Sequence, residues 1–112
     1  MSRLQAIVFA SLLAVGMTGG NAFAADPEVM LVIRNHQFEP MEIKVPAGQR
    51  VKLIVHNQDA TPEEFESHDL NREKVVPAGS KVTIYIGPLK PGRYGYYGEY
   101  HEASAKGAVV AE

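Results

Sequence analysis

From about residue 28 onward, apolar and polar residues alternate in short runs that predict β-strands. The runs are rich in β-branched and aromatic residues, and Pro and Gly separate them at close spacing. We predict seven strands, near residues 29–35, 41–45, 50–57, 72–76, 80–86, 93–97 and 106–111. Seven short strands in one small domain indicate an all-β sandwich.

The same alternation predicts which side chains face the core. In the strand at 50–57, for example, Val51, Leu53 and Val55 share one face, because successive side chains in a strand point to opposite sides. The complete predicted inward set is Ile43, Val45, Val51, Leu53, Val55, Val82, Ile84, Ile86, Tyr94 and Tyr96.

The first 24 residues have the features of a secretory signal peptide. Arg3 gives a positive start, residues 6–15 form an apolar run too short to span a bilayer, and residues 22–24 (AFA) fit a small-x-small cleavage site. We therefore expect residues 1–24 to be a signal peptide, residues 25–112 to be one domain, and the mature protein to be exported to a bacterial periplasm. An uncleaved anchor is the alternative. After cleavage, no further apolar run predicts insertion into a membrane.

Charge and cysteine content narrow the classes of function. The formal net charge of −2 argues against nucleic acid as a partner. The chain has no cysteine, so disulfides cannot stabilise this small domain, and burial and a bound ion are the remaining means. It has no nucleophile–base–acid set, no phosphate-binding glycine loop and no His-x-x-x-His zinc pair, so hydrolase chemistry has no support.

Several segments resemble the cupredoxin family across nearly the whole chain after residue 25. They are FEPMEIKVPAG at 38–48, VKLIVHN at 51–57, PGRY at 91–94 and GAVV at 107–110. The resemblance implies a Greek-key β-sandwich with copper at one end. In that family the copper is held by a His on one loop and by a Cys, a second His and usually a Met on the loop before the last strand.

This chain departs from the family's ligand pattern. Residues 62–65 (PEEF) lie where the family has a Pro-His-x-Phe segment, so Glu63 stands at the position of the first histidine. Residues 98–101 (GEYH) lie over the family's Cys-x-x-His, and Ala105 stands at the methionine position. Of the four ligands only His101 is kept. Because a blue-copper site needs a thiolate, this chain cannot form one.

Strand direction predicts where the candidate metal ligands meet. If consecutive strands run up and down, the connections at 36–38, 58–64, 77–79 and 98–105 lie at one end of the sandwich. The residues that this gathers, and that we predict as metal ligands, are His36, Glu63, Glu99 and His101. Such imidazole and carboxylate donors favour an iron ion, a manganese ion or Cu(II) over Cu(I). The alternative is an acidic loop exposed to solvent, which is the better interpretation for Glu66.

Three short segments, TPEEFES at 61–67, NREKVVP at 71–77 and GEYH at 98–101, resemble a cysteine-less cupredoxin-like branch found with bacterial ferrous-iron uptake systems. The resemblance implies a periplasmic metal-binding protein that serves iron uptake and assists Fe(II) oxidation. Its expected partners are a periplasmic iron-binding protein and an inner-membrane iron permease. Because the sequence shows no second redox centre, we expect a binding or relay component rather than a stand-alone oxidase.

Two other functions remain open at this point. A periplasmic copper-handling protein would use His36 and His101, with Met41 as a third candidate ligand for Cu(II). A metal-free interaction module would instead present an exposed tyrosine patch and would melt at the same temperature with and without metal ions.

Overall fold

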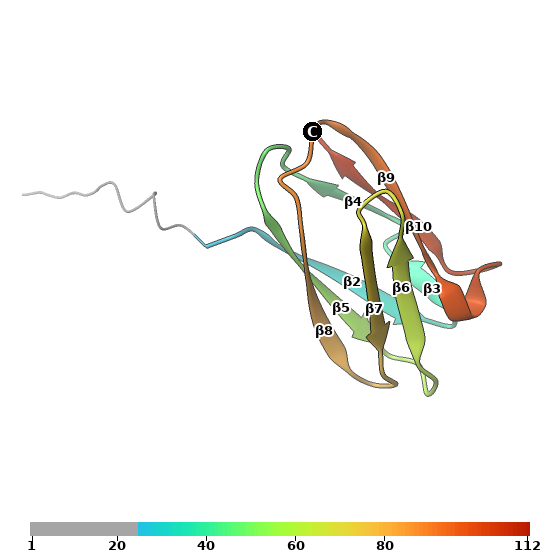
Figure 1. Ribbon diagram of the computed structural model, residues 1–112. Helices are drawn as coiled ribbons and strands as arrows, with labels where there is room; N and C mark the ends of the chain where they lie inside the picture. Colours follow the sequence, from blue (N-terminus) through green and yellow to red (C-terminus); the bar gives the residue numbers. More distant parts are fainter. Residues whose placement is uncertain (1–24) are drawn as a thin grey trace, which may run out of the picture.

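Two β-sheets pack face to face in the computed structural model, which describes residues 25–112 (Figure 1). The five-stranded sheet has the order β4-β10-β9-β6-β7, and the four-stranded sheet has the order β3-β2-β5-β8. The strands are β2 (Glu28–Arg34), β3 (Gln37–Glu39), β4 (Glu42–Val45), β5 (Val51–Asn57), β6 (Glu63–Ser67), β7 (Arg72–Val76), β8 (Lys81–Ile86), β9 (Gly92–Gly98) and β10 (Lys106–Ala111). A short 3-10 helix, η3 (Glu99–His101), follows β9. The predicted signal peptide lies outside the described residues.

The all-β prediction is confirmed, with two strands more than expected. The first, β3, pairs with β2 after a tight reversal in which Asn35 and His36 both have positive φ, at 54° and 57°. The second, β6, begins at Glu63, so the prediction of a loop through residue 64 is wrong. Its inward residues are Glu63, Phe65 and Ser67, two of which are polar, so the strand lacks the apolar alternation by which the others were predicted.

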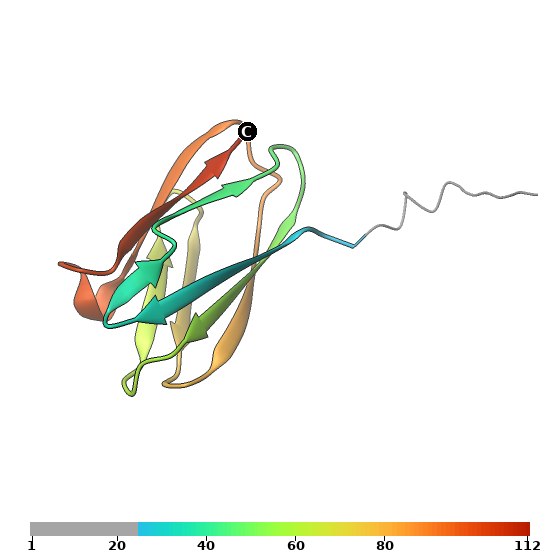
Figure 2. The same cartoon turned by 180° about the vertical axis from the view of Figure 1, so that it is seen from behind.

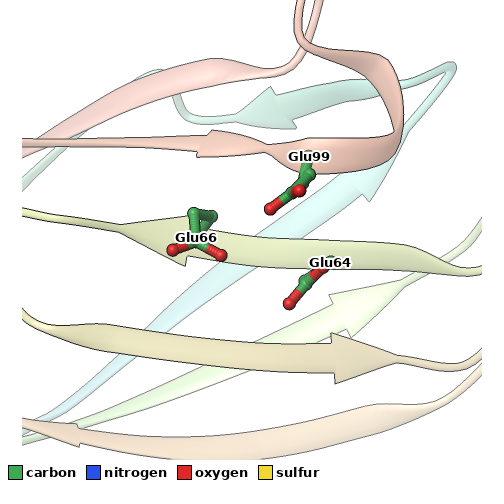
Figure 3. A group of neighbouring side chains, drawn as sticks. All are labelled: Glu64, Glu66 and Glu99. Carbon is green, nitrogen blue, oxygen red and sulfur yellow. The ribbon is translucent and has the colours of Figure 1, made fainter.

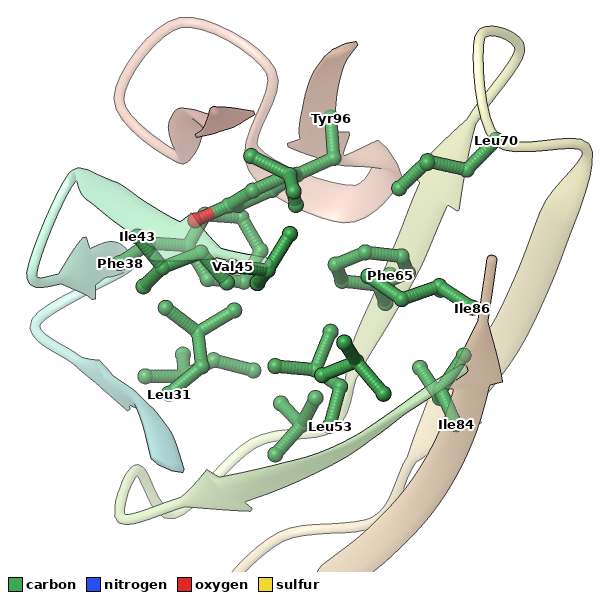
Figure 4. Close-up of a cluster of buried hydrophobic side chains, with 14 of the residues drawn as sticks. Leu31, Phe38, Ile43, Val45, Leu53, Phe65, Leu70, Ile84, Ile86 and Tyr96 are labelled. Carbon is green, nitrogen blue, oxygen red and sulfur yellow. The ribbon is translucent and has the colours of Figure 1, made fainter. Parts of the chain in front are cut away.

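The core lies between the two sheets (Figure 4). Most of the predicted inward residues are buried, whereas Val82 and Tyr94 are only partly buried at the margin. At its centre an aromatic cluster joins the sheets: the ring of Tyr96 lies 4.9 Å from that of Phe38 and 5.0 Å from that of Phe65, centroid to centroid. Such contacts add packing energy to the apolar area that the rings bury.

Tyr96 also contributes a polar atom to this core. Its hydroxyl is buried and has no hydrogen-bond partner among the described residues. An unpartnered buried hydroxyl costs about 1–3 kcal/mol, because it has lost its bonds to water. We therefore expect Tyr96→Phe to raise the free energy of unfolding by about 1 kcal/mol in urea titrations. A variant less stable than the parent would contradict this, since it would show that the hydroxyl is bonded in solution.

The four connections that were expected at one end of the sandwich do meet there (Figure 2). The backbone N–H of Gln58 donates to the Ile33 carbonyl at 2.8 Å, and the backbone N–H of Asn57 donates to the Ser80 carbonyl at 2.8 Å. The Ser104 hydroxyl donates to the His36 carbonyl at 2.6 Å. We call this end the loop pole; it comprises residues 35–36, 58–62, 77–80 and 98–105.

No helix among residues 25–112 is long and apolar enough to cross a membrane.

Candidate metal centre

Glu63 is a buried carboxylate at the loop pole, with 1% of its surface exposed. Its Oε1 accepts hydrogen bonds from the amides of Glu64 and Tyr100, each at 2.9 Å. Its Oε2 lies 2.7 Å from Nδ1 of His101. Burying an anion is costly unless donors surround it, and here two amides and one imidazole do so. Residues 63 and 101, far apart in sequence, therefore meet as predicted.

This contact fixes the tautomer of the His101 ring. Because a carboxylate oxygen can only accept a hydrogen bond, Nδ1 of His101 carries the proton. The proton-free nitrogen of a neutral ring is then Nε2, which makes no hydrogen bond to the described residues. The side chain is 29% exposed, so the ring reaches solvent.

His36 lies directly against His101. The two imidazole rings stack with their centroids 3.6 Å apart and their planes 13° from parallel. Nδ1 of His36 in turn lies 3.5 Å from Oδ2 of Asp59. Each ring of this histidine pair thus has a carboxylate beside its Nδ1, and both rings are partly exposed at the loop pole.

Asp59 holds the reversal that presents His36. Its carboxylate accepts the amides of Asn35 at 2.8 Å and His36 at 2.9 Å. Burial acts to raise the pKa of Asp59, but these two amide bonds and the nearby histidines outweigh it, so the pKa is lowered. Asp59 is not among the residues predicted from the sequence. The available signal was an acidic residue in a short polar loop, QDAT at 58–61, which is common in any turn.

Gly98 and Ala105, at the positions of the family's cysteine and methionine ligands, leave no space between them and Glu63. A Cβ added at Gly98 would be 2.6 Å from Cδ of Glu63 and 2.7 Å from Cβ of Ala105. The positions that correspond to the family's first histidine, cysteine and methionine therefore do converge, but the Glu63 carboxylate fills the space between them. These residues do not fit a blue-copper ion, in agreement with the prediction from the sequence.

Glu99 is placed on a different group of residues from the other three predicted ligands. Its carboxylate gathers with those of Glu64 and Glu66 from β6 (Figure 3), and one oxygen from each lies within 4.8 Å of the others. Within residues 25–112, His36, Glu63, Glu99 and His101 do not form such a group. The structure thus brings His36, Glu63 and His101 together and places Glu99 with the half-buried Glu64 and Glu66, where carboxylate oxygens suit hard cations.

The crowding of these glutamates changes their protonation. A hydrogen bond with Glu73, burial and repulsion from Glu73, Glu99 and Glu66 raise the pKa of Glu64 to about 7. Because the folded protein holds this proton more tightly than the unfolded chain, the stabilisation is complete at low pH and is lost as the pH rises through about 7.

We therefore expect the urea midpoint to fall between about pH 5 and pH 8, and the Glu64→Gln variant to show a smaller fall. Glu39→Gln is the control, because Glu39 is exposed on the other sheet and pairs with Arg34. Equal falls in the parent and in Glu64→Gln would contradict the assignment to Glu64.

The family model for the cupredoxin-like domain matches residues 6–111 of this chain. A curated relative, an uncharacterized protein of Rickettsia prowazekii (strain Madrid E), is 45% identical over 83 residues, or 74% of this chain. This chain spans 66% of that relative's length.

Similar solved structures include auracyanin A, a blue copper protein of Chloroflexus aurantiacus, with 14% identity, 79% of this chain and 100% of that chain covered, and a TM-score of 0.68. The metal-binding domain of a Cu(I)-exporting ATPase of Streptococcus pneumoniae D39 has 13% identity, 76% and 84% coverage and a TM-score of 0.68. A chain of a heme-copper terminal oxidase has 22% identity, 78% and 65% coverage and a TM-score of 0.64. At these identities the likeness concerns the fold. Together with the family match, it shows that the chain belongs to the cupredoxin-like domain family.

Proposed function

We propose that the protein binds a transition-metal ion through His36 and His101, in the periplasm, and that this binding serves iron uptake. The observation that carries the proposal is the stacked histidine pair with a carboxylate beside each Nδ1. Histidines that bind metals commonly donate their second ring N–H to a carboxylate, which orients the ring and makes the other nitrogen a better donor. His101 makes such a bond at 2.7 Å, whereas the Asp59 carboxylate lies 3.5 Å from Nδ1 of His36.

The two rings are near enough to share an ion once they turn out of the stack, because an imidazole nitrogen binds a metal in the plane of its own ring. Two neighbouring nitrogen ligands on one ion lie about 3 Å apart when each metal–nitrogen bond is about 2.1 Å. The ring centroids here are 3.6 Å apart, and both rings reach solvent. In this proposal Glu63 and Asp59 do not bind the ion themselves, because backbone amides already engage both carboxylates.

Iron is the proposed cargo because of the negative charge around the pair. Glu63 and Asp59 lie beside the two rings. Glu64 directly follows Glu63, and Glu99 directly precedes Tyr100, whose amide donates to Glu63. Nearby negative charge stabilises Fe(III) more than Fe(II), so it would make oxidation of Fe(II) more favourable. Oxidation of Fe(II) would pass one electron to an acceptor that this chain does not supply, such as dioxygen. We propose that the protein works with a periplasmic iron-binding protein and an inner-membrane iron permease rather than alone. A role for Glu99 as a ligand stays a prediction.

Copper handling is a second candidate, favoured by the donor type. Both proposed ligands are imidazoles, and divalent copper binds such nitrogen ligands more tightly than iron does. Met41, the third ligand that this function would use, is 69% exposed, and its carbonyl accepts the Ala108 amide in the ladder between β4 and β10. The copper proposal therefore rests on the histidine pair.

The histidines of this chain supply a matched experiment. We expect calorimetric titrations with Fe(II) under anaerobic conditions, and with Cu(II), to show one saturable site. His36→Ala and His101→Ala should each weaken binding at least tenfold, and Asp59→Asn about 10-fold to 100-fold. His56→Ala and His68→Ala remove the other two histidines and should leave the affinity unchanged. Because copper binds imidazoles more tightly than iron at any such site, the metal found in protein purified from its own periplasm, and not the order of the affinities, distinguishes the two functions. A melting temperature that neither ion raises would contradict both and favour the metal-free module.

A further inference from the structure

A concave surface lies on β9 and β10, beside the turn between β6 and β7. It is a depression of about 450 Å³, within the range of small binding pockets. Its lining includes Gly95, Gly107, Tyr97, His68, Glu102 and Lys106. We call it the Tyr97 pocket.

The pocket exists because a turn replaces part of the sheet. The pairing of β6 with β9 ends at Glu66 and Tyr97. Beyond it the Ser67 hydroxyl donates to the Gly95 carbonyl at 2.7 Å, and the Asp69 carboxylate accepts the Gly95 amide at 2.9 Å. Since Gly95 has no side chain, the floor there is backbone. Nε2 of His68 lies 3.2 Å from the Tyr97 hydroxyl and supports the wall.

Six carboxylates, of which Asp69 and Glu102 line the pocket, differ from all others among residues 25–112 because none has an ion-pair partner. Those elsewhere are paired with an arginine, lysine or histidine: Asp26, Glu28, Glu39, Glu42, Asp59, Glu63 and Glu112. The unpaired ones are Glu64, Glu66, Asp69, Glu73, Glu99 and Glu102. Burial, together with the charges of four of these glutamates, raises the pKa of Tyr97.

We propose that the Tyr97 pocket receives an arginine or lysine side chain of a basic partner protein, with the cation over the Tyr97 ring and beside Glu102. An aromatic face next to unpaired carboxylates attracts a cation through both the ring and the charges. The excess of negative charge around it would also steer a basic surface toward this face. Lys106 also lines the pocket and offsets part of this charge, although it makes no ion pair among the described residues.

The test uses a short acetylated and amidated peptide, Gly-Arg-Gly-Arg-Gly, added to the purified protein in EDTA so that metal binding plays no part. We expect saturable changes in the amide NMR signals of Gly95, Tyr97 and Gly107 that weaken as salt is added. Tyr97→Ala and Glu102→Gln should each weaken binding about threefold or more.

Two controls make the result decisive. Glu28→Gln removes a carboxylate that pairs with Lys52 on the other sheet, and it should leave binding unchanged. A peptide with glutamine in place of arginine should not bind. Signal changes spread over the whole surface, equal weakening in Glu28→Gln, or binding of the glutamine peptide would each overturn the proposal, as would an absence of saturable changes. None of these results depends on the histidine pair, so the proposed metal function stands or fails separately.

Discussion

Replacing Glu63 by alanine is expected to lower the free energy of unfolding by about 3–5 kcal/mol, the largest effect that we predict for one substitution. The substitution leaves the amides of Glu64 and Tyr100 and Nδ1 of His101 without their acceptor. It also opens a cavity at a side chain that is 1% exposed. Urea unfolding of the metal-free protein measures the difference.

The matched variant is Glu63→Gln, which keeps the shape and one carbonyl oxygen. We expect it to cost less than Glu63→Ala, because the amide oxygen can still accept the two backbone bonds. Equal losses in the two variants would show that the charge matters and the packing does not. A loss below about 1 kcal/mol in Glu63→Ala would contradict the buried, fully bonded carboxylate that the structure shows.

Replacing Gly98 by alanine is expected to cost about 1–3 kcal/mol, because the new methyl group has no room. Its carbon would lie 2.6 Å from Cδ of Glu63 and 2.7 Å from Cβ of Ala105, and Ala105 is fully buried. In the Glu63→Ala background the first clash is absent and the second remains. The cost of the Gly98 substitution should therefore fall by about 0.5 kcal/mol or more, measured as a double-mutant cycle in urea.

Gly95 provides the control on the same strand. A Cβ there would meet only Oδ2 of Asp69, at 3.7 Å, which is an ordinary contact. We expect Gly95→Ala to change the free energy of unfolding by less than about 1 kcal/mol. If Gly95→Ala and Gly98→Ala cost the same, or if the cycle shows no coupling, the close packing of Gly98 against Glu63 is wrong.

The frame of the fold could be predicted from the sequence because its strands carry apolar side chains at every second position. In β5 the buried residues are Val51, Leu53 and Val55, as the alternation indicates. β6 does not follow this pattern, because Glu63 and Ser67 take inward positions beside Phe65. The bonds that make a buried glutamate tolerable come from His101 and Tyr100, far along the chain, so no local pattern reports them.

The candidate site divides in a similar way. The meeting of Glu63 with His101 could be predicted from the family resemblance and from strand direction, and His36 from strand direction. The place of Glu99 could not, because η3 begins at that residue and its carboxylate joins those of Glu64 and Glu66 on β6. Asp59 was missed because its role comes from the amides of Asn35 and His36, which only the fold brings near.

The loop pole shows how a member of this family can lack the sulfur ligands and still have no void at their position. Glu63 fills the space between Gly98 and Ala105, and its bonds to two amides and to His101 satisfy the buried charge. The consequence for function is that His101 turns Nδ1 inward to the carboxylate. The nitrogen left for an ion is Nε2, beside the ring of His36.

The most direct test of this account is a nitrogen-15 NMR spectrum of the four histidine rings while Zn²⁺, a diamagnetic probe for the ion, is added. We expect Nδ1 of His101 to carry the proton throughout, and Nε2 of His36 and of His101 to shift together and saturate, while the rings of His56 and His68 do not change. Binding at Nδ1 of His101, or equal shifts in all four rings, would contradict the histidine pair as the metal centre.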